Sequence, residues 1–129
     1  MLWQRTNVII RHLAGDDKQQ AKLAGELFGR CDRGDLTLVV LSAVVAETVF
    51  VLESFYQHPR AAIARTLAAF LASPGVEVTD LDIHLSALSR YGKTRLHFVD
   101  CLIAEHASAL HCPVASFDKE LLKATDKKP

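Results

Sequence analysis

Apolar and polar positions follow two different spacings along the chain, and each spacing predicts one kind of element. Apolar residues three and four positions apart over 18–33 and 60–72 predict helices with one buried face. A Val-rich run over 36–41 lacks that spacing and predicts a strand that is buried on both faces. In chain order, the pattern predicts a strand and then a helix within 2–10, a helix over 18–33, a strand over 36–41, helices over 43–56 and 60–72, a strand over 76–78, helices over 81–91 and 98–110, a strand over 113–117, and a helix over 118–123.

The alternation of strands with helices predicts the fold class. Strands separated by helices favour an α/β domain with a mostly parallel central sheet flanked by helices. The length of 129 residues suits a single domain over residues 1–129, with a frayed polar tail over 124–129. In sheets of this kind, functional sites form beyond the carboxyl ends of the strands. Side chains that follow the predicted strands are therefore the first candidates for function.

Two polar residues are expected to cap the helices that they precede. Asp17 follows a break in the apolar pattern and can accept a hydrogen bond from an N–H group at the start of the helix over 18–33. Ser42 has the same position before the helix over 43–56. We expect both side chains to satisfy N–H groups that have no partner inside the helix.

The charge balance argues against a strongly basic nucleic-acid binder. Fifteen Lys and Arg residues balance fifteen Asp and Glu residues, so the formal net charge at pH 7 is +0. Contact with RNA would then depend on a local basic patch or on a bound metal ion. The sequence has no G-x-G-x-x-G and no G-x-x-x-x-G-K-[ST] motif, which disfavours an enzyme with a nucleotide cofactor.

The cysteines and the apolar segments indicate a cytoplasmic protein. Cys31, Cys101 and Cys112 are odd in number, lie among apolar neighbours and form no C-x-x-C pair, so we expect buried, reduced thiols. The longest apolar segment, 36–52, contains Glu47 and is shorter than the roughly 20 residues that a membrane span needs. We therefore expect no membrane segment and a reducing compartment.

Three carboxylates among apolar neighbours suggest a cation site. Glu47 lies inside an apolar run, Asp100 lies in the apolar start of a predicted helix, and Asp118 follows the predicted strand over 113–117. A carboxylate beside a core loses solvation unless a cation or hydrogen-bond donors compensate for the loss. Acids at the starts of separate helices can converge at one edge of a sheet, and clustered carboxylates favour Mg²⁺ or Mn²⁺.

Each of these acids also has a simpler structural explanation. Asp118 can cap the short helix that follows it, and this explanation is favoured for Asp118 taken alone. Glu47 and Asp100 can each form an ion pair with an arginine. From the positions of the acids alone, a shared metal site and separate structural roles both stay open.

Four short motifs, taken in order, resemble those of PIN domains. T-N-V-I-I over 6–10 resembles the family's opening D-T-N-[VI]-[LI], and V-V-A-E over 44–47 resembles the segment with its second acid. F-V-D-C-L-I-A over 98–104 resembles the helix start with the third acid, and S-F-D over 116–118 resembles the closing [ST]-x-D. Each motif is short, and the ordered set is the specific signal.

The resemblance implies a metal-dependent endoribonuclease. It runs from about Leu2 to Lys123, and the length and the loop after Gly15 are most similar to the VapC toxins of toxin–antitoxin pairs. In that family, carboxylates hold Mg²⁺ or Mn²⁺, and the metal activates a water that attacks an RNA phosphodiester. A VapB-like antitoxin and a homodimer are the implied partners. Carried over residue by residue, the catalytic and metal-binding acids are Glu47, Asp100 and Asp118, and the supporting residues are Thr6, Asn7 and Ser116.

The chain departs from the family at the first acid, because Arg5 occupies that position. A guanidinium there could pair with Asp100 or Asp118 and replace the cation electrostatically. Alternatively, Arg5 could turn to solvent and leave a three-acid site with low metal affinity. In both cases we expect metal binding to be weakened or absent and cleavage to be impaired.

Two other functions compete with an active ribonuclease. One is a PIN-fold protein that no longer cleaves and binds an antitoxin or RNA, with Arg5 inside the metal site as an antitoxin arginine would be. The other is an α/β domain that binds a small ligand. The helices over 43–56 and 60–72 are candidates for a dimer face, although core packing is the default explanation for both.

Several basic residues are candidates for contact with RNA. Phosphates could contact them near the mouth of the expected site, and a histidine before the helix over 98–110 could act as a base. A solvated surface position is the more common role for each one. These residues are Arg11, Lys93, Arg95, Lys119 and His97.

Overall fold

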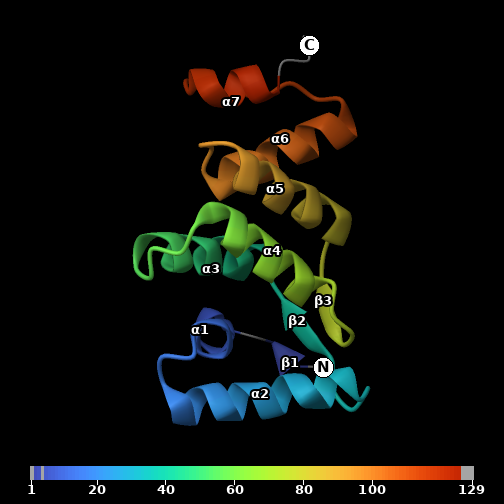
Figure 1. Cartoon of the computed structure of the whole chain (residues 1–129). Helices are drawn as coiled ribbons and strands as arrows, with labels where there is room; N and C mark the ends of the chain where they lie inside the picture. The colour runs from blue at the N-terminus through green and yellow to red at the C-terminus, as the bar shows by residue number, and fades with distance from the viewer. Residues whose placement is uncertain (1, 4, 126–129) are drawn as a thin grey trace.

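The chain folds around a small sheet with helices on both sides. The structure is a computed structural model that describes residues 2–3 and 5–125. The elements in chain order are β1 (Leu2–Trp3), α1 (Thr6–Ala14), α2 (Lys18–Asp32), β2 (Leu38–Val40), α3 (Ser42–Ser54), α4 (Arg60–Leu71), β3 (Val76–Val78), α5 (Leu81–Lys93), α6 (Phe98–Leu110) and α7 (Lys119–Ala124). In Figure 1 the strands lie between the α1–α2 pair below and α3 and α4 above, and α5, α6 and α7 follow upward.

The strands form one parallel sheet in the order β1-β2-β3. Leu38 of β2 pairs with Leu2 on one side and with Val76 on the other. Each crossover between neighbouring strands passes through two helices, as parallel strands require. Because the strands are parallel, their carboxyl ends share one edge of the sheet, and Arg5 and Ser42 follow shortly after two of these ends.

The core combines the strands with the apolar faces of the central helices. Val45, Val49 and Leu52 share one face of α3 and are at most 2% exposed, as helical spacing predicts. Ile63 and Leu67 of α4 are each 1% exposed. Burial of each such side chain contributes about 1.5–3 kcal/mol relative to leaving it in water.

Arg60 connects three of the central helices. Its Nη1 lies 3.2 Å from Oε1 of Glu53 on α3, and its Nε donates to the carbonyl of Tyr91 on α5 at 3.1 Å. The guanidinium also lies 3.8 Å from the centroid of the Tyr91 ring, and the Tyr91 hydroxyl donates to Glu53. Burial and this hydrogen bond to Glu53 raise the pKa of Tyr91. The cluster fixes α3, α4 and α5 relative to one another.

Most of the predicted elements are confirmed. The helices predicted over 18–33, 60–72 and 98–110 are observed as α2, α4 and α6, with ends that differ by no more than one residue. Asp17 caps α2 as expected, because its carboxylate accepts a hydrogen bond from Gln20 N at 3.0 Å. The parallel α/β architecture is confirmed as well.

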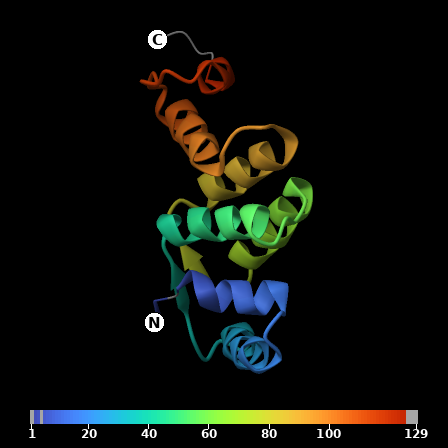
Figure 2. The same cartoon turned by 90° about the vertical axis from the view of Figure 1, so that its left-hand side faces the viewer.

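The strand predicted over 113–117 is wrong. In the described structure these residues form an irregular connection between α6 and α7. Both views place α7 at the opposite end of the molecule from α2 (Figure 1, Figure 2). A strand needs a neighbouring strand to supply its hydrogen-bond partners, and this connection runs away from the sheet. Phe117 is consequently fully exposed.

Two smaller expectations are also wrong. Ser42 does not cap α3, because Leu41 is the N-cap residue and Ser42 is already helical. The Ser42 hydroxyl instead lies 2.6 Å from Nε2 of His84. Cys112 is exposed, whereas Cys31 and Cys101 are buried as expected.

The expectation of a frayed tail over 124–129 falls mostly outside the described residues. Helix α7 continues to Ala124, and the structure does not describe residues 126–129. Within the described ranges, no helix is both long enough and apolar enough to cross a membrane.

Candidate functional site

A cleft of about 320 Å³ lies between α1 and α3. The start of α1, Arg11 in its last turn, and the second turn of α3 supply its charged residues, and aromatic and aliphatic side chains contribute to its wall. We call this hollow the α1–α3 cleft. Its lining residues are Arg5, Thr6, Asn7, Ile10, Arg11, Glu47, Val51, Phe55 and Tyr56.

The start of α1 brings three polar residues to the cleft. Arg5 is the N-cap residue, with an extended backbone (φ −96°, ψ 155°) and a side chain that makes no capping hydrogen bond. Thr6 and Asn7 are the first two helical residues, so their N–H groups have no acceptor inside the helix. The cleft therefore receives the positive end of the α1 dipole together with a guanidinium.

Thr6 carries an unsatisfied hydroxyl. The residue is 7% exposed, and its Oγ1 is a buried polar atom with no hydrogen-bond partner among the described residues. A hydroxyl that is buried without a partner costs about 1–3 kcal/mol. Such a group is consistent with a partner that the chain itself does not supply.

Glu47 reaches the cleft from α3. The buried face of this helix carries Val45, Thr48 and Val49, and Glu47 lies beside that face with its side chain exposed. The apolar neighbours in the sequence suggested a desolvated acid, and the structure corrects that expectation. Glu47 faces solvent because the neighbouring positions, and not its own, point into the core.

Arg11 belongs to a polar network at one side of the cleft. Its Nη1 lies 2.9 Å from Oδ1 of Asp16, and its Nε donates to Gln20 Oε1 at 2.8 Å. Tyr56, which the sequence pattern indicated only as a helix end, donates its hydroxyl to Asp16 Oδ2 at 2.6 Å. The hydrogen bond from Tyr56 and those from Arg11 lower the pKa of Asp16. The network joins the loop before α2 to the region just after α3.

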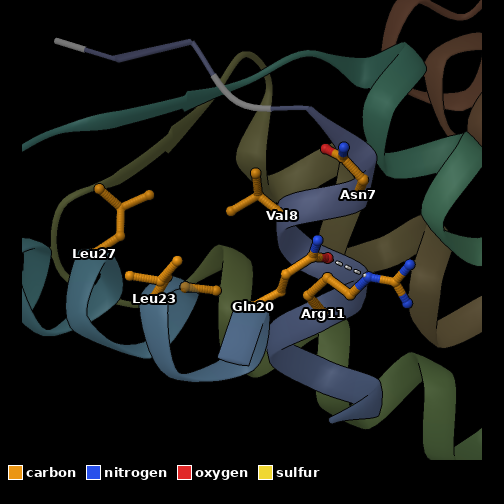
Figure 3. Close-up of a pocket in the computed structure, with 7 residues that line it drawn as sticks. Asn7, Val8, Arg11, Gln20, Leu23 and Leu27 are labelled. Carbon is orange, nitrogen blue, oxygen red and sulfur yellow. Dashed lines mark hydrogen bonds between the residues drawn. The ribbon is translucent and has the colours of Figure 1, made fainter. Parts of the chain in front are cut away.

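A second hollow, between α1 and α2, lies on the other side of Arg11 (Figure 3). Its volume is about 320 Å³, and Val8, Leu23 and Leu27 make part of its wall apolar. Figure 3 shows the Arg11 guanidinium pointing away from the two leucines while Nε is bonded to Gln20. Arg11 lines both hollows, so it separates this groove from the α1–α3 cleft.

The two remaining predicted acids lie outside the cleft. Asp100 is in the first turn of α6 and is half-buried. Asp118 is the N-cap residue of α7, and its carboxylate accepts hydrogen bonds from Glu120 N at 2.9 Å and Leu121 N at 3.2 Å. The Asp118 N–H donates to Ser116 Oγ at 2.9 Å. The capping role considered for Asp118 is therefore confirmed.

The predicted site residues fall into separate groups. Arg5, Thr6, Asn7 and Glu47 share the α1–α3 cleft. Ser116 and Asp118 belong to the start of α7, at the other end of the molecule (Figure 1). The cause of the separation is the connection over 113–117, which carries α7 away from the sheet instead of adding a strand to it.

The residues as placed do not fit a divalent cation. Throughout residues 2–3 and 5–125, no group of three or more His, Cys, Asp or Glu side chains could hold a metal ion. Glu47 shares the cleft with two guanidinium groups, those of Arg5 and Arg11, and such groups repel a cation. In the part of the chain that is described, Arg5 forms no ion pair with Asp100 or Asp118.

Of the candidate RNA contacts, Arg11 lies at the cleft. Lys93 and Arg95 are exposed near the connection between α5 and α6, and Lys119 is exposed on α7. His97 is the N-cap residue of α6, is exposed, and makes no side-chain cap bond. None of these four residues lines the α1–α3 cleft.

The sequence pattern also missed a buried histidine near the same edge of the sheet. His84 is 1% exposed, with Nε2 at 2.6 Å from Ser42 Oγ and Nδ1 at 3.0 Å from the carbonyl of Asp80. A carbonyl only accepts, so Nδ1 carries a proton and, in the neutral ring, Nε2 accepts from the Ser42 hydroxyl. His84 has helical spacing with the buried residues Leu88 and Tyr91, and this spacing could have predicted that His84 is buried.

Comparison with known proteins adds one finding to this geometry. A profile of the PIN domain family matches residues 6–128. No curated protein and no solved structure matches the chain at a significant level. The matched range begins directly after Arg5 and covers nearly the whole chain, including the segments with Glu47, Asp100 and Asp118. The chain belongs to the PIN domain family.

Proposed function

We propose that this chain is a VapC-type ribonuclease in which Arg5 impairs cleavage. PIN domains are commonly nucleases, often ribonucleases, and generally use divalent metals. The observation that carries the proposal is that Asn7, Glu47 and Arg5, the residue that we assign to the position of the first acid, line the same α1–α3 cleft. Single-stranded or looped RNA is the proposed substrate, because it can present a phosphodiester to an open cleft.

The cleft residues have distinct proposed parts in that activity. Glu47 has an exposed carboxylate that can accept a proton from an attacking water. Asn7 can orient a substrate oxygen through its amide, and Arg5 and Arg11 can attract the phosphodiester. The acids as placed do not support a metal-dependent step, which is the physical reason to expect impaired cleavage.

Asp100 and Asp118 are proposed to complete the catalytic acids, with Thr6 and Ser116 in support. Asp118 can join Glu47 only if the connection over 113–117 brings the start of α7 to the sheet. Strand β1 pairs with β2 alone among the described strands, so its other edge has no strand partner there and could pair with such a connection. In that assembled arrangement, Glu47, Asp100 and Asp118 would hold Mg²⁺ or Mn²⁺, which would activate the attacking water.

Cleavage of a looped RNA with Mn²⁺ tests the proposal on the native chain, on Arg5→Asp, and on Arg5→Asp combined with Asp100→Ala. Arg5→Asp removes a repulsive charge and adds a carboxylate, so we expect at least about a tenfold faster rate, which corresponds to roughly 1.4 kcal/mol. Adding Asp100→Ala should abolish the gain. If Arg5→Asp and the native chain are both inactive, the ribonuclease proposal is wrong.

A second candidate is a PIN-fold protein that binds an antitoxin or RNA without cleaving. It is favoured by the position of Arg5 inside the cleft, where it resembles an arginine supplied by an antitoxin. Cells without a VapB-like antitoxin should then tolerate the native chain and stop growing when they express Arg5→Asp. Severe growth arrest by the native chain would contradict this candidate.

The remaining partner and location proposals rest on surface features. Phe50 and Phe55 are exposed on α3 and just after it, and apolar groups of this size at a surface favour a homodimer or antitoxin contact. The free thiols favour the cytoplasm. Size-exclusion chromatography with light scattering tests the dimer, and a monomer at micromolar concentration would contradict it.

A further inference from the structure

We propose that the α1–α3 cleft is a phosphate site, which binds an RNA phosphate directly through Arg5, Thr6 and the start of α1 in the absence of a divalent metal. The inference rests on the proposed function for the identity of the carrier, RNA. The family's first acid attracts a cation, whereas Arg5, which we assign to the same position, attracts an anion.

The charges around the cleft favour an anion. Arg5 and Arg11 contribute two positive charges, and Glu47 contributes the negative charge that faces them. Asp16 neutralises Arg11 in part, through the contact of 2.9 Å. Arg5 makes no ion pair with any described acid, so its guanidinium is available for a bidentate contact with phosphate oxygens.

The start of α1 adds backbone donors to the same place. Helix α1 has 9 residues, and its N-cap side chain leaves the first turn uncapped. Val8 N donates to the Arg5 carbonyl at 3.2 Å, whereas the N–H groups of Thr6 and Asn7 have no acceptor among the described residues. Free N–H groups at a helix start, together with the helix dipole, favour a bound phosphate.

The buried hydroxyl of Thr6 is an independent observation that favours a ligand at this place. Thr6 lines the cleft, is more than nine-tenths buried, and carries the unpartnered Oγ1 described above. Because Oγ1 is shielded from solvent, we expect a rotation about χ1 to turn it toward a bound oxyanion. Threonine side chains have more than one accessible rotamer at helix positions.

A cation would be less stable in this place. One carboxylate, that of Glu47, would have to offset the repulsion of two guanidinium groups. Mg²⁺ usually binds through one or two carboxylates together with substrate phosphates and water, and here both arginines line the same cleft as the one carboxylate. Arginine is also the residue type that proteins favour for the recognition of phosphate.

Binding measured in EDTA tests the inference without any metal. A fluorescent single-stranded oligoribonucleotide and inorganic phosphate are titrated separately, the first by anisotropy and the second by amide NMR shifts. Arg5→Gln should weaken RNA binding about tenfold, the loss expected for one charge-assisted contact. Arg65→Gln is the matched control, because Arg65 is an exposed arginine on α4 that does not line the cleft.

The second variant, Thr6→Val, should have opposite effects on the stability of the free protein and on its affinity for phosphate or RNA. Removing an unpartnered buried hydroxyl should raise the melting temperature of the free protein by roughly 3 °C. The same change should weaken phosphate or RNA binding about threefold, because one donor is lost. A variant that is less stable and binds normally would contradict the assignment of Thr6 to the site.

The outcomes distinguish binding of an RNA phosphate from binding of free phosphate. They also distinguish this inference from the proposed ribonuclease activity. RNA binding that depends on Arg5 but not on Arg65 supports the inference, whether or not free phosphate also shifts the amides of Thr6 and Asn7. Equal losses in Arg5→Gln and Arg65→Gln, or binding that requires Mn²⁺ and is lost in Glu47→Gln, would overturn it. Cleavage by Arg5→Asp is measured independently, so the proposed ribonuclease can stand or fail apart from this site.

Discussion

At the scale of single residues, the three thiols of the chain lie in different surroundings. Cys101 is fully buried, and this burial raises the pKa of its thiol to about 11. Burial also raises the pKa of Cys31, which is 2% exposed. Cys112 is exposed beyond the end of α6. Because the thiolate is the reactive form, exposure and pKa together decide which cysteine reacts.

We therefore expect one fast and two slow thiols in the folded protein. A disulfide reagent at about pH 8, near the ordinary thiol pKa of about 8.5, should modify Cys112 rapidly and should reach Cys31 and Cys101 only on unfolding. The measurement is the number of protein thiols that the reagent has modified as a function of time, with and without denaturant. Cys112→Ser should remove the fast phase, and a fast phase that survives this change would contradict the predicted burial.

At the scale of elements, a hydrogen bond joins the starts of α3 and α5. The Ser42 hydroxyl meets Nε2 of His84 at 2.6 Å, and the other ring nitrogen is held by the Asp80 carbonyl at 3.0 Å. The pair lies near the carboxyl ends of β2 and β3. Since His84 is buried, removal of its partner leaves a ring nitrogen unsatisfied in the core.

Ser42→Ala should lower the free energy of unfolding by about 1–3 kcal/mol, the cost of an unsatisfied buried polar group. Urea denaturation at neutral pH measures the change. Ser54→Ala is the matched control, because Ser54 is exposed at the other end of α3 and should change stability by less than about 0.5 kcal/mol. Similar effects of the two substitutions would contradict a role for the hydrogen bond with His84.

At the scale of the whole molecule, the connection between α6 and α7 has little regular structure and joins the last helix to the rest of the described fold. Within residues 113–117, no backbone hydrogen bond to another element is present. Phe117 is fully exposed, and Leu110, at the end of α6, is 69% exposed. Segments with few buried contacts and unpaired backbone open at low free energy and are the preferred sites of proteolysis.

Limited digestion with chymotrypsin should therefore cut first after Phe117. Mass spectrometry of the early products identifies the cut, and Phe117→Ser should slow it by removing the recognised side chain. If RNA or a partner brings this connection to the sheet, as the proposed assembly of Asp118 with Glu47 requires, the ligand should protect the site. A first cut inside α3 or α4 would contradict the described fold.

Helix positions and two of the three proposed caps were predictable from the sequence, because they depend on neighbours within a few residues, whereas the cap expected at Ser42 is wrong. The spacing of Ile63, Leu67 and Leu71 is enough to place α4 and its buried face. Asp17 and Asp118 are local caps for the same reason. The ordered motifs with Asn7 and Glu47 also indicated the PIN domain, and the family match over residues 6–128 confirms it.

Contacts between distant segments were decided by the tertiary structure. The apolar run over 113–117 reads as a strand, yet a strand exists only where another strand offers hydrogen bonds, and α6 carries this run away from the sheet. Burial of His84, exposure of Glu47 and the separation of Asp118 from the cleft have the same origin. The sequence by itself determined the family and most of the helices, and it predicted that Arg5 occupies the position of the first acid. The packing of those helices alone determined which polar residues face one cleft, because convergence is a property of three-dimensional distance and has no period along the chain.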